Sequence, residues 1–171
     1  MTAIEERTTV TPGKSTHDRT QRSVDEATRT LTLPHLPYAD AVVAELDAVC
    51  MPPAAVEVGM RDPHMSHPEL FLRAVWPAGA SALDERVQDQ GLSLSWSHVT
   101  GWSAHDADSQ CVLLDLDTLA DPRLIAHAAL HFAEEPLTGG ETWTPPPGPD
   151  RWAFALELDI ALVNFEERET R

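Results

Sequence analysis

Apolar and polar side chains alternate in the middle of the chain, and this pattern predicts β-strands. In the clearest run, 92–97, Leu92, Leu94 and Trp96 alternate with three serines, so that one face is buried and the other faces water. Apolar runs of strand length also occupy 54–60, 70–76 and 111–116. Thr100-Gly101 predicts a turn, and residues 104–109 are typical of a polar loop. We therefore expect an antiparallel sheet of about four strands.

Apolar residues spaced three or four apart predict helices before and after these strands. The first helix begins at Pro37, a favourable first-turn residue, and ends ahead of Pro52-Pro53. Another begins at Asp121-Pro122, where an N-cap acid precedes a first-turn proline, and continues to about Glu135. A short polar helix is expected over 82–90, closed by a glycine. Helices packed on an antiparallel sheet define an α+β fold.

Residues 152–165 carry two patterns at once. Apolar and other residues alternate as in a strand, yet Ala, Leu and Glu are helix formers and Asp150 is a good N-cap. We interpret the segment as a helix with two apolar faces. One face comprises Trp152, Leu156, Ile160 and Val163, and the other comprises Phe154, Leu158 and Phe165. The second face then needs a partner, which is either a second copy of the chain, giving a homodimer, or the domain itself, clamped by the helix.

Composition divides the chain into four parts. Residues 1–30 are rich in Thr, Ser and Arg and poor in large apolar side chains, so they cannot offset the entropy of ordering and are expected to form a disordered arm. Residues 31–135 form the α+β domain. Residues 136–149, rich in proline and glycine, are a linker or an extended strap. Residues 150–171 form the last helix and a tail.

The charge excludes two classes of partner. The chain has 12 basic and 28 acidic side chains, a net charge of −16. The arm holds equal numbers of each sign, so the whole excess falls on residues 31–171. Such a body repels the phosphates of nucleic acid and the headgroups of anionic membranes. The acidity either keeps the protein soluble or steers it to a basic protein partner.

The compartment follows from what the chain lacks. No apolar run approaches the roughly 18 residues needed to cross a bilayer, and the first 15 residues lack the apolar core of a signal peptide. Cys50 and Cys111 are far apart and lie beside apolar residues, which is typical of reduced, half-buried thiols. We expect a cytoplasmic protein. Its single lysine and its many Ala, Pro, Asp and Arg residues are typical of a high-G+C bacterium.

Two histidine pairs are the candidate metal ligands. His127 and His131 are four apart on a predicted helix, a spacing that lets two imidazoles share one cation. His64 and His67 lie in a polar loop with Asp62, a mixed set that suits a borderline cation. The glutamate of a HExxH motif is missing, and both pairs are equally described as ordinary surface histidines. No cofactor is expected.

Other catalytic patterns are weak or missing. Asp106 with Asp108 and Asp115 with Asp117 have the spacing of paired carboxylates, but aspartate is also a normal turn residue. The chain contains no GxSxG, P-loop, GxGxxG or CxxC motif. An enzyme assignment therefore has no support.

Aromatic and apolar residues supply the candidate partner contacts. Trp76 and Trp96 lie on predicted strands and belong to the core, whereas Trp102 follows a turn and Trp143 lies in the strap. A tryptophan at the surface is a favoured binding anchor, although each could also attach its loop to the domain. The complete candidate set is Trp102, Trp143, Trp152, Phe154 and Leu158.

Three short motifs support a resemblance. They are Pro37-Tyr38, Trp96 followed by Gly101-Trp102, and Asp121-Pro122-Arg123. Over residues 35–135 the chain resembles a small family from high-G+C Gram-positive bacteria that is known only as a domain of unknown function. The resemblance implies a compact α+β domain and no activity. From the residues, the leading hypothesis is a non-enzymatic, acidic protein-binding or regulatory module, and the alternative is a metal-binding protein or metal-dependent enzyme that uses the histidines.

Overall fold

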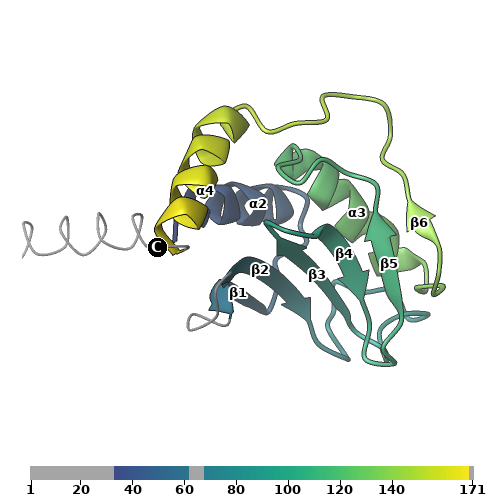
Figure 1. Ribbon diagram of the computed structural model, residues 1–171. Helices are drawn as coiled ribbons and strands as arrows, with labels where there is room; N and C mark the ends of the chain where they lie inside the picture. Colours follow the sequence, from purple (N-terminus) through teal and green to yellow (C-terminus); the bar gives the residue numbers. More distant parts are fainter. Residues whose placement is uncertain (1–32, 62–67, 170–171) are drawn as a thin grey trace, which may run out of the picture.

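The computed structural model describes residues 33–61 and 68–169, so the predicted arm 1–30 lies outside it. The helices are α2 (Leu36–Ala48), α3 (Pro122–Glu134) and α4 (Ala155–Glu169). The strands are β1 (Ala55–Arg61), β2 (Glu69–Trp76), β3 (Leu92–Ser97), β4 (Gly101–His105), β5 (Cys111–Leu114) and β6 (Thr142–Trp143). Figure 1 shows α2 and α3 against one face of the sheet. The protein is α+β, as predicted.

The six strands form one sheet in sequence order. Neighbours from β1 to β5 are antiparallel, and β6 adds in parallel to β5. The expected count of about four was too low for two reasons. In β4 the small Ala104 conceals the alternation, so a turn and a loop are predicted there. The two-residue strand β6 has no pattern to detect; it pairs with β5, and the Asp115 backbone N–H donates to the Trp143 carbonyl at 2.8 Å.

The helices at both ends of the domain were predicted well. Proline occupies the first turn of α2. At α3 the Asp121 side chain caps the helix by accepting from the Arg123 backbone N–H at 3.0 Å. Residues 155–169 are helical, which resolves the ambiguity of the last segment in favour of helix.

The helix predicted over 82–90 is wrong, because this segment forms consecutive turns. A tertiary hydrogen bond competes with helix formation. The Asp84 backbone N–H donates to the Ala133 carbonyl of α3 at 2.8 Å, while the Gly79 N–H donates to the Gln88 carbonyl at 2.9 Å. Leu83 and Val87 are buried by this arrangement, so the apolar side chains are satisfied without a helix.

The core is organised around Tyr38, the only tyrosine of the chain. Its hydroxyl donates to the Ala120 carbonyl at 2.9 Å and accepts from Nε1 of Trp102 at 3.1 Å. Its ring lies 5.8 Å from that of Trp96 and 5.1 Å from that of Trp152. Burial raises the pKa of the hydroxyl far above its usual range, so it stays a neutral donor. The cluster joins α2, the sheet and the segment before α4.

His35 lies beneath the same cluster and is fully buried. Its ring stacks on Trp96 at 5.4 Å, and its Nε2 lies 3.0 Å from the Phe71 carbonyl. That carbonyl can only accept, so Nε2 carries the proton. Nδ1 has no partner among the described residues. Burial accordingly lowers the pKa of His35 to about 4.

Replacement of Tyr38 by Phe should destabilise the fold. The variant leaves Nε1 of Trp102 and the Ala120 carbonyl buried without a partner, at a cost of about 1–3 kcal/mol in the free energy of unfolding. Urea denaturation measures this loss, and an unchanged m-value shows that the surface exposed on unfolding is the same. A loss below about 0.5 kcal/mol would show that the two hydrogen bonds of the Tyr38 hydroxyl group contribute little to stability.

Stability should fall in mild acid because of His35. Its pKa is about 4 in the folded protein and 6.5 unfolded, so the unfolded chain binds more protons between these values. The contribution of the neutral, buried His35 to the free energy of unfolding is therefore complete above pH 6.5. It is lost as the pH falls towards 4, and the loss reaches up to about 3 kcal/mol. Denaturant unfolding across this range should show a flatter pH profile for His35→Gln. His127→Gln, on the surface of α3, is the control and should keep the wild-type slope; equal slopes for the two variants would contradict the assignment.

Candidate functional site

The predicted metal ligands are only partly visible. His127 and His131 are exposed on α3, and the His131 ring lies against Phe132 at 4.9 Å and Trp143 at 6.3 Å. His64 and His67 lie outside the described residues. Within the described ranges no three His, Cys, Asp or Glu side chains are grouped so that they could hold a metal ion. The four-histidine site stays a prediction.

Two of the four candidate carboxylates, Asp106 and Asp117, have local roles. Asp106 accepts from the Gln110 backbone N–H at 2.9 Å, and Asp117 accepts from that of Leu119 at 2.8 Å. Asp117 also pairs with Arg151 at 3.3 Å. Each acid therefore stabilises a turn, as expected of aspartate in such positions.

The cysteines differ from the expectation of half-buried thiols, since both are exposed. Cys50 follows the end of α2 in a turn with a positive φ of 59°. Cys111 begins β5, where alternation places Val112, and not Cys111, in the core. The apolar residues next to them in the sequence, Met51 and Val112, are buried, whereas the cysteines themselves are not. The apolar neighbours therefore gave a wrong prediction for the thiols.

The structure separates the five candidate contact residues. Trp102 is 2% exposed and Leu158 is 4% exposed, so both side chains lie in the core and not at the surface. The alternation of β4 directs Trp102 into the core, and α4 turns Leu158 towards it. Trp143 and Trp152 are half-buried against the core. Only Phe154, 59% exposed, projects well into solvent.

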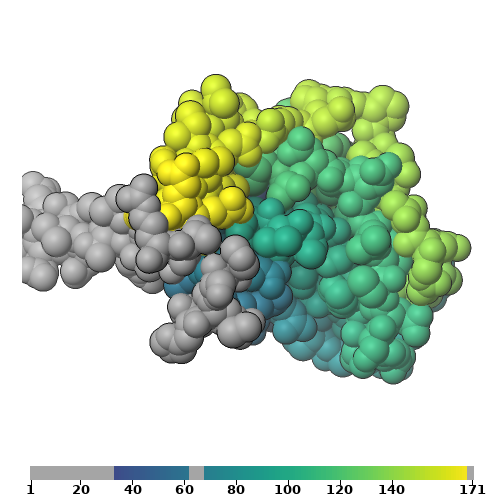
Figure 2. All heavy atoms as spheres, viewed as in Figure 1, coloured from purple at the N-terminus to yellow at the C-terminus, as the bar shows by residue number. Residues whose placement is uncertain are grey.

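One of the two predicted apolar faces of α4, that of Leu156, Ile160 and Val163, is exposed. The buried face of the helix comprises Ala155, Leu158, Leu162 and Phe165, and packs on the core. Leu156, Ile160 and Val163, here called the outer stripe, follow one another at helical spacing and are 67%, 57% and 54% exposed. Figure 2 shows α4, in yellow, standing at the molecular surface. A helix with an uncovered apolar stripe has the form of a docking surface.

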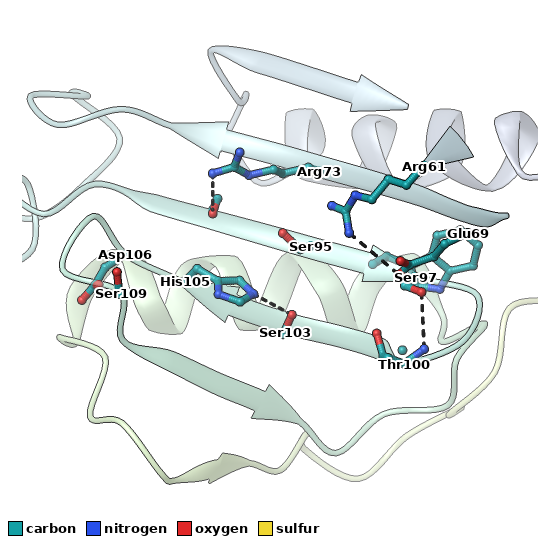
Figure 3. A pocket seen from close by; sticks show the side chains of 13 residues that line it. Arg61, Glu69, Arg73, Ser95, Ser97, Thr100, Ser103, His105, Asp106 and Ser109 are labelled. Carbon is teal, nitrogen blue, oxygen red and sulfur yellow. Dashed lines mark hydrogen bonds and ion pairs between the residues drawn. The ribbon is translucent and has the colours of Figure 1, made fainter. Parts of the chain in front are cut away.

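The face of the sheet opposite α2 and α3 carries a polar groove. Its floor is the central strand β3, which contributes Ser93, Ser95 and Ser97 to the lining; Ser95 and Ser97 are labelled in Figure 3. The register aligns Ser95 with Arg73 on one side and Ser103 on the other. The groove has a volume of about 520 Å³. Its lining, here called the serine groove, is Arg61, Glu69, Arg73, Ser93, Ser95, Trp96, Ser97, Thr100, Gly101, Ser103, His105, Asp106 and Ser109.

The arginines of the serine groove have long contacts. Arg61 is 3.8 Å from Glu69, and Arg73 is 3.8 Å from Glu57 and 3.5 Å from the Ser93 hydroxyl. Elsewhere in the described chain, Arg123 approaches Asp121 to 2.7 Å. Short, bidentate contacts are the strong ones for a guanidinium group. Arg61 and Arg73 therefore keep much of their hydrogen-bonding capacity.

His105 completes the serine groove. Its Nε2 lies 2.8 Å from Oγ of Ser103, two residues earlier on the same face of β4 (Figure 3). Burial lowers the pKa of His105, the positive charge of Arg73 lowers it further, and Asp106 opposes both. At neutral pH the imidazole is thus uncharged and has one donor and one acceptor nitrogen. Such a ring can bind either a hydroxyl group or an amide.

The sequence contained only part of the signal for this groove. The three serines of 92–97 are visible in the alternation, but they were expected to face water, whereas Ser93 and Ser97 are buried and Ser95 is half-buried. Arg73 and His105 are 32 positions apart in the sequence, and only strand register places them on either side of β3.

No known protein family, characterised protein or solved structure matches the chain. Among the described residues, no helix has the length and apolar character of a membrane span.

Replacing Arg73 by Met should raise the pKa of His105. The substitution removes a nearby positive charge that disfavours the imidazolium form, while burial still holds the pKa below its ordinary value. NMR titration of the imidazole resonances measures the change. Arg86→Met removes the same charge outside the groove and should leave His105 unaffected. An identical His105 titration in wild type and Arg73→Met would show that the two groups do not interact.

Proposed function

We propose that the protein is a non-enzymatic, acidic protein-binding module whose outer stripe receives a basic amphipathic helix of its partner. The observation that carries this proposal is the exposure of Leu156, Ile160 and Val163 on a helix whose opposite face is already packed. Exposed aliphatic side chains in a continuous stripe gain free energy when a partner covers them. A helix laid along them would use the common helix-in-groove or helix-pair mode.

The charge around the outer stripe selects the partner. Glu157 lies beside Leu156, and Glu167 continues the stripe one turn beyond Val163; both are exposed. The chain as a whole carries −16. Two copies pairing through α4 would bring these acids together, whereas a partner with lysine or arginine beside its apolar positions would neutralise them. The charge therefore favours a different, basic protein over a homodimer.

The outer stripe should determine affinity for a basic helix. A fluorescent synthetic Leu/Lys peptide with leucines at helical spacing serves as the probe, and anisotropy measures its binding to the full chain. Leu156→Ser with Ile160→Ser should weaken binding at least tenfold, because burying one such side chain contributes about 1.5–3 kcal/mol. Higher salt should also weaken binding.

Two controls separate docking from unspecific attraction. Val99→Ser removes another exposed aliphatic side chain, 70% accessible and outside α4, and should bind the peptide as wild type does. A scrambled peptide of equal charge should bind more weakly than the amphipathic one. Equal affinity of both peptides, or of the stripe variant and wild type, would refute the proposal. A salt-resistant dimer abolished by the stripe variant would identify a second copy as the occupant instead.

A further inference from the structure

The serine groove has the shape of a small-molecule site, which the protein-binding proposal does not require. Serine is a poor strand former, and a central strand is stabilised by larger side chains. Three serines on one face of β3 leave a trough between the longer side chains of Arg73 on β2 and His105 on β4. Its volume of about 520 Å³ falls within the range of ligand pockets, roughly 300–1,000 Å³. A second hollow of about 150 Å³ adjoins it and shares Arg73, Ser93, His105 and Asp106.

Two polar groups of this trough lack partners of their own. The hydroxyl group of Ser95, in the middle of the floor, makes no hydrogen bond to any other described residue. Oδ2 of Asp106 is buried and has no partner within the described ranges, and Asp106 lines both hollows. Buried polar atoms without partners are destabilising. Together they mark a place where an additional polar molecule would complete the hydrogen bonding.

The charges define what that molecule is. Arg61 and Arg73 balance Glu69 and Asp106, so the groove is formally neutral in a strongly acidic protein. Arg73 stands over the serine floor with its guanidinium group loosely engaged (Figure 3), and this group matches a carboxylate or a phosphate. Glu69 and Asp106 would repel a polyanion such as nucleic acid. One anionic group is therefore accommodated, and the remaining donors and acceptors suit hydroxyl groups.

We infer that the serine groove binds a small polyhydroxylated anion, such as a sugar acid or a sugar phosphate. Arg73 holds the anionic group, while Ser95, Ser103 and His105 hydrogen-bond to the hydroxyl groups. The register that aligns Arg73, Ser95 and Ser103 across three strands makes this a single contiguous site. The inference is independent of α4, because no residue of the outer stripe lines the groove.

NMR titration of the isotope-labelled full chain tests the site. The probes are gluconate, glucose 6-phosphate and neutral glucose, which separate a carboxylate, a phosphate and the hydroxyl groups alone. At least one anionic probe should shift the amide resonances of 93–97 and 101–106, with an affinity at least tenfold above that of glucose, since a hydrogen-bonded charged group contributes about 1.5–3 kcal/mol. The better of the two anions identifies the charged group.

Three variants make the outcome decisive. Arg73→Gln should reduce the affinity for the anionic probe about tenfold, whereas Arg86→Gln, which removes the same charge outside the groove, should not. Ser95→Val fills the trough with a side chain that favours strands, so it should abolish binding without loss of stability. The inference is overturned if neither anion shifts the groove resonances, if Arg73→Gln binds as wild type does, or if the shifts cluster elsewhere.

Discussion

The hydroxyl group of Tyr38 joins three parts of the chain that are distant in sequence. It links α2 to the Ala120 carbonyl just before α3 and to Trp102 in β4, and the same ring supports Trp152 ahead of α4. A buried hydroxyl must have partners, and those partners must in turn be held in place. Because each link satisfies a group that would otherwise be buried without a partner, the positions of the helices on the sheet are defined together.

This requirement also explains why the two sheet faces differ so strongly. Trp96 and Trp102 are paired across β3 and β4, and their large side chains occupy the helical face. Strand alternation then sends Ser95, Ser97 and Ser103 to the opposite face. With no helix to cover this face in the described chain, small polar residues leave a hollow there. The serine groove is thus the reverse side of the aromatic core.

The two surfaces with binding character meet at one turn. His98, in the turn between β3 and β4, contacts Phe165 of α4 edge-to-face at 6.1 Å, and its Nε2 lies 3.7 Å from Glu166. The neighbouring Ser97 and Thr100 line the serine groove. The groove is formally neutral and α4 is flanked by acids, so the two surfaces suit different molecules. Their shared turn makes them parts of one compact domain.

The sequence by itself determined the fold class and the two apolar faces of the last segment. Among the individual elements, it determined α3, β3 and α4 most securely. These depend on local physics: the Asp121-Pro122 cap, the serine alternation of β3 and the helix propensity of 155–169. Only the tertiary structure decided that 82–90 forms turns and that Trp102 is buried, because hydrogen bonds to Ala133 and Tyr38 come from distant parts of the chain. The serine groove likewise depends on register, which joins residues from separate strands, and a linear pattern does not encode which residues will become neighbours across a sheet.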